Sequence, residues 1–174
     1  PWPREAYGRM VDFISAGNPK AITFDILYTE PSIYGEEDDI ALGAAEAKSK
    51  KVIQTFFYSA EDYGKTLMPV KPINDNAALL GNITSAKDSD DIIRRTRLFD
   101  TFNDTEYPTL GLAPLFLNEE APDFSSIPVV DNNTALLRFT KSIDDYFPYS
   151  AKDIRESHDL WLQGKEGVLS PEDF

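Results

Sequence analysis

The segment 20–39 constrains the fold more than any other stretch, because a short apolar run ends in an acid and leads through a Glu-Pro turn into an acidic helical start. Apolar residues at 21–27 predict a buried strand, the pattern at 37–48 predicts a helix, and 52–58 predicts a second, very apolar strand. Strand, helix and strand in this order imply parallel neighbours joined by a right-handed crossover. We therefore predict an α/β fold in which a mixed, largely central β-sheet is flanked by helices and includes the unit at 21–58.

The rest of the chain carries shorter periodic patterns, each bounded by turn signals. Residues 59–76 lose the periodicity, and we expect at most a short strand there. The other expected elements are a helix at 4–16, strands at 79–83 and 92–99 joined in a hairpin, a helix at 109–117, a second hairpin formed by 129–130 and 135–139, and a helix at 150–163 capped by Ser150.

Composition limits the class of protein. A length of 174 residues, of which 41% are hydrophobic, fits one domain over 1–174 with a real core. A formal net charge of −13 makes nucleic acid an unlikely partner and opposes binding to an anionic membrane surface. The absence of cysteine excludes disulfides, thiol catalysis and cysteine-based zinc sites. The chain begins without Met or a signal sequence, so we expect it to be part of a longer protein.

Carboxylates gather where the first expected strand ends. Ligands of open α/β sheets bind beyond the carboxyl ends of strands, so we expect Asp25, Glu30 and Asp39 to lie near one another there. At least one of them should accept hydrogen bonds from backbone amides. For Asp25 the plainer interpretation is a structural acid that caps nearby amides.

The acidic stretch Asp88–Asp91 is similar to the start of a calcium loop. An EF-hand needs Gly at its sixth position and Glu at its twelfth, but Ile93 and Phe99 stand there, which excludes an EF-hand. Two interpretations stay open: an irregular cation site, or a solvated turn whose charge is offset by Arg94 and Arg95.

Catalytic patterns are missing. The strand around Asp25 is similar to the nucleophile strand of haloacid-dehalogenase-type phosphatases, but Leu27 replaces the second Asp that acts as general acid. His158 is the single histidine, and no Gly-x-Ser-x-Gly elbow accompanies it. We therefore expect no catalytic residue, no cofactor and no metal in this segment.

Several motifs occur in a characteristic order. Pro-Trp-Pro-Arg at 1–4 precedes Ala-Ile-Thr-Phe-Asp-Ile-Leu-Tyr-Thr-Glu-Pro at 21–31, and Asp39 opens an Ala-rich helix. Later come Gly81-Asn82-Ile83, then Asp88, Asp90 and Asp91 followed by Arg94-Arg95, then Tyr107-Pro108-Thr109-Leu110, and finally Phe147-Pro148-Tyr149-Ser150. In this order the motifs resemble the CHASE-two family of extracellular sensory domains. One departure is Asp91, which stands where the family usually has Gly.

The resemblance implies a non-catalytic, ligand-sensing input domain on the outer face of the cytoplasmic membrane, within a bacterial transmembrane signalling protein. A class III adenylate or guanylate cyclase is the output we expect, and a histidine kinase, diguanylate cyclase or serine/threonine kinase is the alternative. Expected partners are a small-molecule or ionic signal and a second copy of the chain, and the domain's last strand is expected beyond Phe174. The candidate residues, ligand-binding or structural, are Asp25, Glu30, Asp39, Asp88, Asp90, Arg94 and Arg95.

Two rival functions remain at this point. One is a small acid-dependent hydrolase that uses Asp25, Glu30 and Asp39. The other is a purely structural coupling or dimerisation domain.

Overall fold

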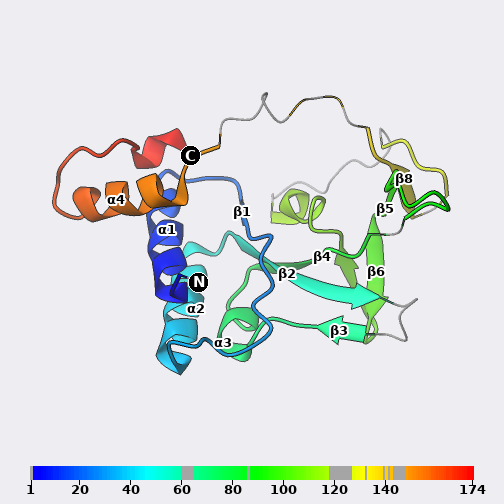
Figure 1. Ribbon diagram of the computed structural model, residues 1–174, viewed down its shortest axis with the longest axis horizontal. Helices are drawn as coiled ribbons and strands as arrows, with labels where there is room; N and C mark the ends of the chain where they lie inside the picture. Colours follow the sequence, from blue (N-terminus) through cyan, green and yellow to red (C-terminus); the bar gives the residue numbers. More distant parts are fainter. Residues whose placement is uncertain are drawn as a thin grey trace.

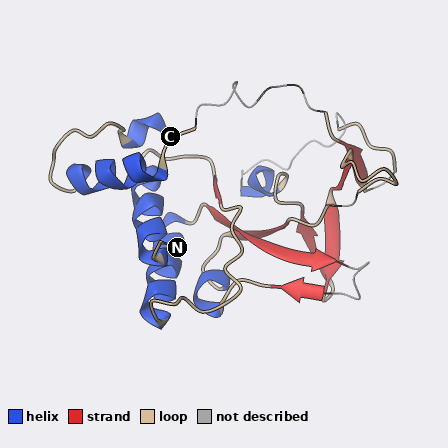
Figure 2. Cartoon of the chain, in the orientation of Figure 1, coloured by secondary structure: helices blue, strands red, loops and turns tan. Residues whose placement is uncertain are grey.

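The computed structural model describes residues 2–59, 65–85, 87–117, 127–131, 133–138, 140, 142 and 148–174. Long helices gather on one side of the molecule and strands on the other (Figures 1 and 2). The helices are α1 (Arg4–Ala16), α2 (Glu36–Ser49), α3 (Lys71–Asn74) and α4 (Ala151–Trp161), with 3₁₀ helices η1 (Ala113–Leu117) and η3 (Pro171–Asp173). The strands are β1 (Ile22–Thr23), β2 (Val52–Ser59), β3 (Lys65–Leu67), β4 (Leu79–Asn82), β5 (Arg95–Arg97), β6 (Phe99–Phe102), β7 (Thr105–Pro108) and β8 (Thr134–Leu136).

Strand β2 is the centre of the main sheet. It pairs in parallel with β1 and β4 and antiparallel with β3, so the sheet is mixed, as predicted. The parallel pairing of β1 with β2 across α2 confirms the strand–helix–strand unit. Residues 52–56 of β2 are buried without alternation, which is expected for a strand covered on both faces.

Strand β1 is much shorter than the predicted strand at 21–27. The pairing ends with Phe24, whose N–H bonds to the carbonyl of Ile53, and the chain then leaves the sheet. Tyr28 anchors the departing segment, because its ring is buried and its carbonyl accepts a hydrogen bond from the N–H of Val70. The apolar side chains of Ile26 and Leu27 are therefore partly exposed rather than buried in a strand.

The predicted hairpin of 79–83 with 92–99 is wrong. Strand β4 pairs with β2, whereas the second segment divides into β5 and β6, which pair with β8 and β7. Asn103 and Asp104 both have positive φ and form the two-residue turn that joins β6 to β7. This tight turn explains why β6 pairs with β7 rather than with β4. At Leu98, between β5 and β6, the N–H bonds to the carbonyl of Asn133.

Three smaller predictions meet mixed outcomes. The helix at 109–117 exists only as η1, because Thr109 forms an isolated parallel bridge with Asn82. The second hairpin is confirmed by the Val129–Ala135 bridge, although Phe139 lies outside the described residues. Helix α4 begins at the predicted place, but the Ser150 side chain makes no capping hydrogen bond.

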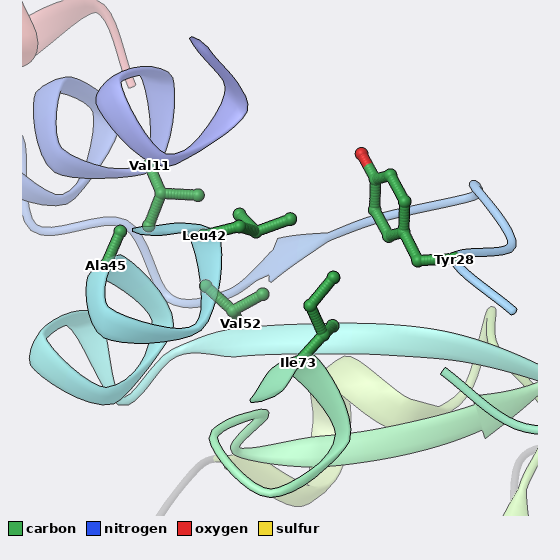
Figure 3. Close-up of a cluster of buried hydrophobic side chains, with 6 residues drawn as sticks. All are labelled: Val11, Tyr28, Leu42, Ala45, Val52 and Ile73. Atoms are coloured by element: carbon green, nitrogen blue, oxygen red, sulfur yellow. The ribbon is translucent and has the colours of Figure 1, made fainter. Parts of the chain in front are cut away.

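The main core joins the helical side to the sheet. Val11 of α1, Leu42 and Ala45 of α2, Val52 of β2, Ile73 of α3 and the ring of Tyr28 form one buried cluster (Figure 3). Helices α1 and α2 approach closely at Gly8, where a Cβ would lie 3.2 Å from the carbonyl oxygen of Ala41. Helix α4 packs on the other end of α1, where Phe13 contacts the rings of Trp161 and Phe174.

Candidate ligand pocket at the β1–α2 loop

A pocket of about 310 Å³ lies between the segment that follows β1 and the start of α1. Its position beyond the carboxyl end of β1 is where ligands of open α/β sheets bind. Most of its surface is apolar or aromatic. The lining residues are Trp2, Arg4, Tyr7, Ile26, Leu27, Tyr28, Thr29, Glu30, Pro31, Ser32, Ile33 and Tyr34.

Arg4 organises one wall of this pocket. Its guanidinium pairs with the carboxylate of Asp39 and donates a hydrogen bond to the backbone carbonyl of Glu30. The same group lies 4.9 Å from the centre of the Tyr28 ring. Both members of the ion pair are largely buried, with side-chain exposures of 12% and 4%. Arg4 therefore ties α1 to α2 and to the pocket loop.

Asp38 caps α1 from the neighbouring helix. Pro3 precedes α1 and supplies no side-chain acceptor, but Asp38 accepts hydrogen bonds from the N–H groups of Arg4 and Glu5, each at 2.8 Å. The hydroxyl of Ser32 also donates to this carboxylate. Burial alone would raise the pKa of Asp38, but the hydrogen bonds from Glu5, Ser32 and Arg4 outweigh it and lower the pKa. The cap is therefore present at neutral pH and is lost as the pH falls through the lowered pKa of Asp38.

The three predicted carboxylates have different settings. Glu30 lines the pocket. Asp39 is buried and forms an ion pair with Arg4, which also lines the pocket. Asp39 also accepts a hydrogen bond from the N–H of Ser32 at 3.2 Å, which is the expected contact with a backbone amide. Asp25 is exposed and is not among the lining residues. The pocket and its Arg4 ion pair therefore bring Glu30 and Asp39 together but do not include Asp25.

Aromatic contacts extend from the pocket to the last helix. Tyr7 contacts the rings of Trp2, Phe24 and Tyr28, at centroid separations of 6.1 to 6.4 Å. The guanidinium of Arg155, on α4, lies 5.4 Å from the centre of the Trp2 ring. A change at the pocket can therefore reach α4 through one side-chain contact.

Sequence reasoning missed Arg4, Ser32 and the aromatic wall. Arg4 belonged to the first motif, but nothing local pairs a residue at position 4 with one at position 39. Its role follows from the packing of α1 against α2, which is a contact between segments far apart in the chain.

The second group of predicted residues forms its own polar turn. Asp88 accepts from Arg95 and, at 3.3 Å, from Arg94, which also bonds to Asp90 at 2.8 Å and lowers the pKa of that carboxyl. Asp91 has a φ of +64°, so the turn keeps a glycine-like conformation although the residue is Asp. Asp88 and Asp90 are paired with guanidinium groups and Asp91 with the ammonium of Lys87. No cluster of three or more His, Asp or Glu suited to a metal occurs among the described residues.

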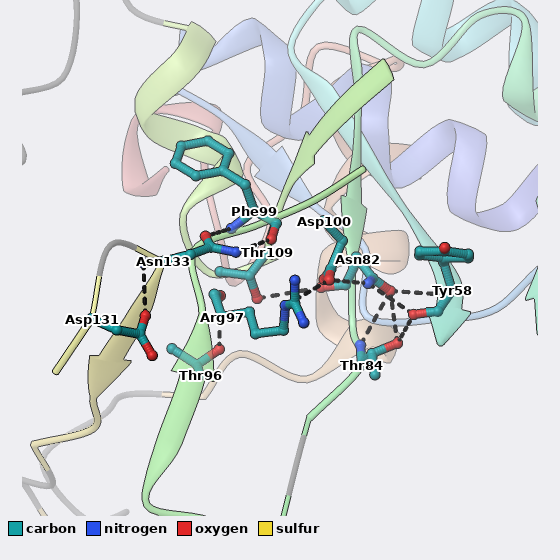
Figure 4. Close-up of polar contacts among 10 residues, drawn as sticks. All are labelled: Tyr58, Asn82, Thr84, Thr96, Arg97, Phe99, Asp100, Thr109, Asp131 and Asn133. Atoms are coloured by element: carbon teal, nitrogen blue, oxygen red, sulfur yellow. Dashed lines mark hydrogen bonds and ion pairs between the residues drawn. The ribbon is translucent and has the colours of Figure 1, made fainter. Parts of the chain in front are cut away.

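The Gly81-Asn82 and Tyr107–Leu110 motifs meet at a structural joint, in which Figure 4 shows Asn82, Asp100 and Thr109. The Asn82 side chain is fully buried, accepts from the N–H of Tyr58, and donates to Tyr58's carbonyl and to Asp100. Asp100 in turn pairs with Arg97 at 2.8 Å. The backbone carbonyl of Asn82 accepts from the N–H of Leu110 at 2.9 Å. The Gly81-Asn82 and Tyr107–Leu110 motifs therefore join the main sheet to the β6–β7 hairpin.

Asn133 forms a second structural contact in the same region. Its amide accepts from the N–H of Phe99 at 2.9 Å and donates to the carbonyl of Phe99 at 2.7 Å. This paired contact imitates a strand partner and holds the β8 hairpin against β6.

Comparison with known proteins gives one match. The family model of the CHASE2 domain, the CHASE-two family, matches residues 1–172. No curated protein and no solved structure matches the chain. Among the described residues, no helix has the length and apolar character needed to cross a membrane.

Proposed function

From the premise that this chain belongs to the CHASE2 family of extracellular sensory domains, we propose that it is the ligand-sensing input domain of a bacterial transmembrane signalling protein. The family is sensory rather than catalytic, and the sequence analysis likewise expects no catalytic residue. The domain acts on the outer face of the cytoplasmic membrane, and the parent protein holds it there through flanking membrane helices.

The pocket beside Arg4 carries this proposal. It is open to solvent, and its walls come from the start of α1 and from the loop that leads into α2. Arg4 and Asp38 bind that loop to both helices, and Arg155 connects the pocket to α4. A ligand that favours one arrangement of the loop therefore shifts the relative positions of three helices. A few kcal/mol of differential affinity is enough to switch a two-state output.

A class III adenylate or guanylate cyclase is the output that we propose, with a histidine kinase, diguanylate cyclase or serine/threonine kinase as the alternatives. Asp25, Glu30 and Asp39, with Asp88, Asp90, Arg94 and Arg95, remain proposals as ligand-binding residues. Glu30 is favoured because it lines the pocket, and Asp39 because it pairs with Arg4, which lines the pocket as well.

The test is a thermal-shift screen of small molecules on three forms of the chain. Ile33 lines the pocket and is 78% exposed, so Ile33→Glu should alter the pocket without unfolding the domain. Val168 is 83% exposed and does not line this pocket, so Val168→Glu is the matched control. We expect a compound that raises the melting temperature of the wild type and the control but not of Ile33→Glu. Equal stabilisation of all three forms would place the ligand elsewhere.

A further inference from the structure

Glu46 is a completely buried carboxyl group on the inner side of α2, with 0% of its surface exposed. The side-chain amide of Gln54, on β2, donates a hydrogen bond to Glu46 Oε1. Glu46 Oε2 and Gln54 Oε1 are both buried and have no hydrogen-bond partner among the described residues. A buried carboxylate is stable only when cations or several donors surround it, and one neutral amide is too little.

No cation from the packed elements pairs with Glu46 among the described residues. Tyr28, from the β1–α2 loop, carries the titratable group that interacts with Glu46, and burial raises the pKa of its phenol above the ordinary value, so the phenol is neutral. Glu46 takes part in no ion pair within the described ranges. The neighbouring pairs are Arg4 with Asp39 and Asp12 with Lys48, which join α1 to α2, and Lys71 with Asp75 at the ends of α3.

Without a compensating cation, the charged form of Glu46 is disfavoured. Burial raises its pKa from 4.5 to about 7, and the hydrogen bond from Gln54 opposes this only in part. The group therefore gains or loses its proton near neutral pH, where an ordinary carboxyl stays ionised.

We propose that Glu46 is a proton-binding site through which this sensory domain reads the acidity outside the cell. The neutral carboxyl fits between α2 and β2, whereas the carboxylate places an unpaired charge at that contact. Helix α2 also carries Asp38 and Asp39, which hold α1 and the pocket loop. Loss of the proton therefore loosens the packing of α2 against the sheet. Because Asp38 and Asp39 of α2 hold the pocket loop, this change also alters the pocket. The sensing role rests on the proposed function, whereas proton binding itself does not.

The sign of the effect follows from linkage. Between pH 4.5, the ordinary pKa, and about 7, the folded chain holds a proton that the unfolded chain has released. Stability therefore falls as the pH rises through this window and becomes level above it. Between about pH 5 and pH 8 the folding equilibrium constant should fall by up to about two orders of magnitude from this one group.

The direct test is a titration of the Glu46 carboxyl carbon by NMR in the 174-residue chain, with Glu46→Gln used for assignment. We expect a midpoint near neutral pH. A midpoint in the ordinary range of glutamate would overturn the proposal. If Glu46→Gln does not fold, assignment through the Glu46 backbone keeps this measurement available.

The second test compares urea unfolding at several pH values for the wild type, Glu46→Gln and Glu37→Gln. Glu37 is an exposed acid on the same helix and serves as the matched control. Relative to Glu46→Gln, the wild type and the control should lose stability steeply between about pH 5 and pH 8. Identical pH profiles for all three forms would contradict the role of Glu46.

The sensing role is tested separately in the parent protein in membranes. Output activity that changes with external pH in the wild type but not in Glu46→Gln supports the proposal. Output that ignores external pH but responds to a pocket ligand overturns the proton-sensing role and leaves the proposed function standing. Output that responds to neither overturns both.

Discussion

Arg4 shows how one side chain can determine the geometry of a site whose carboxylates attract attention first. Its guanidinium meets Asp39, the carbonyl of Glu30 and the ring of Tyr28, which come from a helix and from the loop before it. The neighbouring Asp38 binds the first turn of α1. The acids at the start of α2 thus act on another helix, in addition to favouring their own helix dipole.

Replacement of Arg4 by Met should destabilise the chain strongly. The substitution leaves Asp39 buried without its cation, and such losses typically cost about 3 kcal/mol or more. Arg9→Met is the control, because Arg9 is on the same helix and its ion pair with Glu5 is exposed, so about 1 kcal/mol or less is expected. Urea unfolding at neutral pH measures both. Similar losses in the two variants would show that the Arg4 pair contributes no more than a surface ion pair.

At the scale of elements, the β4 strand and the β7–η1 connection depend on the absence of a side chain. Gly81 faces the backbone of Leu110, and a Cβ at this position would lie 2.6 Å from the Cα of Leu110. The hydrogen bond from the N–H of Leu110 to Asn82 requires the same close approach. Two motifs that are far apart in sequence therefore interlock, which explains a glycine in the middle of a strand.

Gly81→Ala should push these two segments apart and cost about 2 kcal/mol or more, as overpacking against backbone usually does. Gly111→Ala is a suitable control, because nothing lies within 4 Å of the Cβ it would add. Thermal unfolding of the two variants measures the difference. A Gly81→Ala variant as stable as Gly111→Ala would mean that the joint relaxes without loss.

At the scale of the whole molecule, α1 connects the core cluster to the C-terminal segment. Val11 belongs to the core beside α2, whereas Phe13 is fully buried against His158, Trp161 and Phe174. The single histidine is thus part of a ring cluster, which agrees with the absence of a catalytic setting for it. Because Arg155 also contacts Trp2 at the pocket, α4 is in contact both with the last turns of α1 and with the segment that precedes α1.

Phe13→Ala should detach α4 and η3 before it affects the sheet. Removal of a buried phenyl ring costs about 3 to 5 kcal/mol, and most of its ring partners lie in the C-terminal segment. Hydrogen exchange should show lost protection in α4 with protection retained in β2. The exposed Val168, replaced by Ala, is the control. Equal loss of protection in α4 and β2 would instead indicate a single cooperative unit.

The sequence by itself determined the elements whose signals are local. The periodic runs of α1, α2 and β2 and the start of α4 agree with the structure, and the strand–helix–strand order was sufficient for the parallel pairing of β1 with β2. The motif order likewise indicated the family that the comparison then confirmed.

Only the tertiary structure decided how these elements meet. The length of β1 depends on Tyr28, which enters the core and draws the chain out of the sheet. The partners of β4 to β8 depend on contacts across the chain, such as that of Asn82 with Leu110. Arg4 pairs with Asp39, whereas Glu46 has one neutral hydrogen-bond partner. Both outcomes have the same cause, because the surroundings of a buried charge come from segments that are far apart in the sequence.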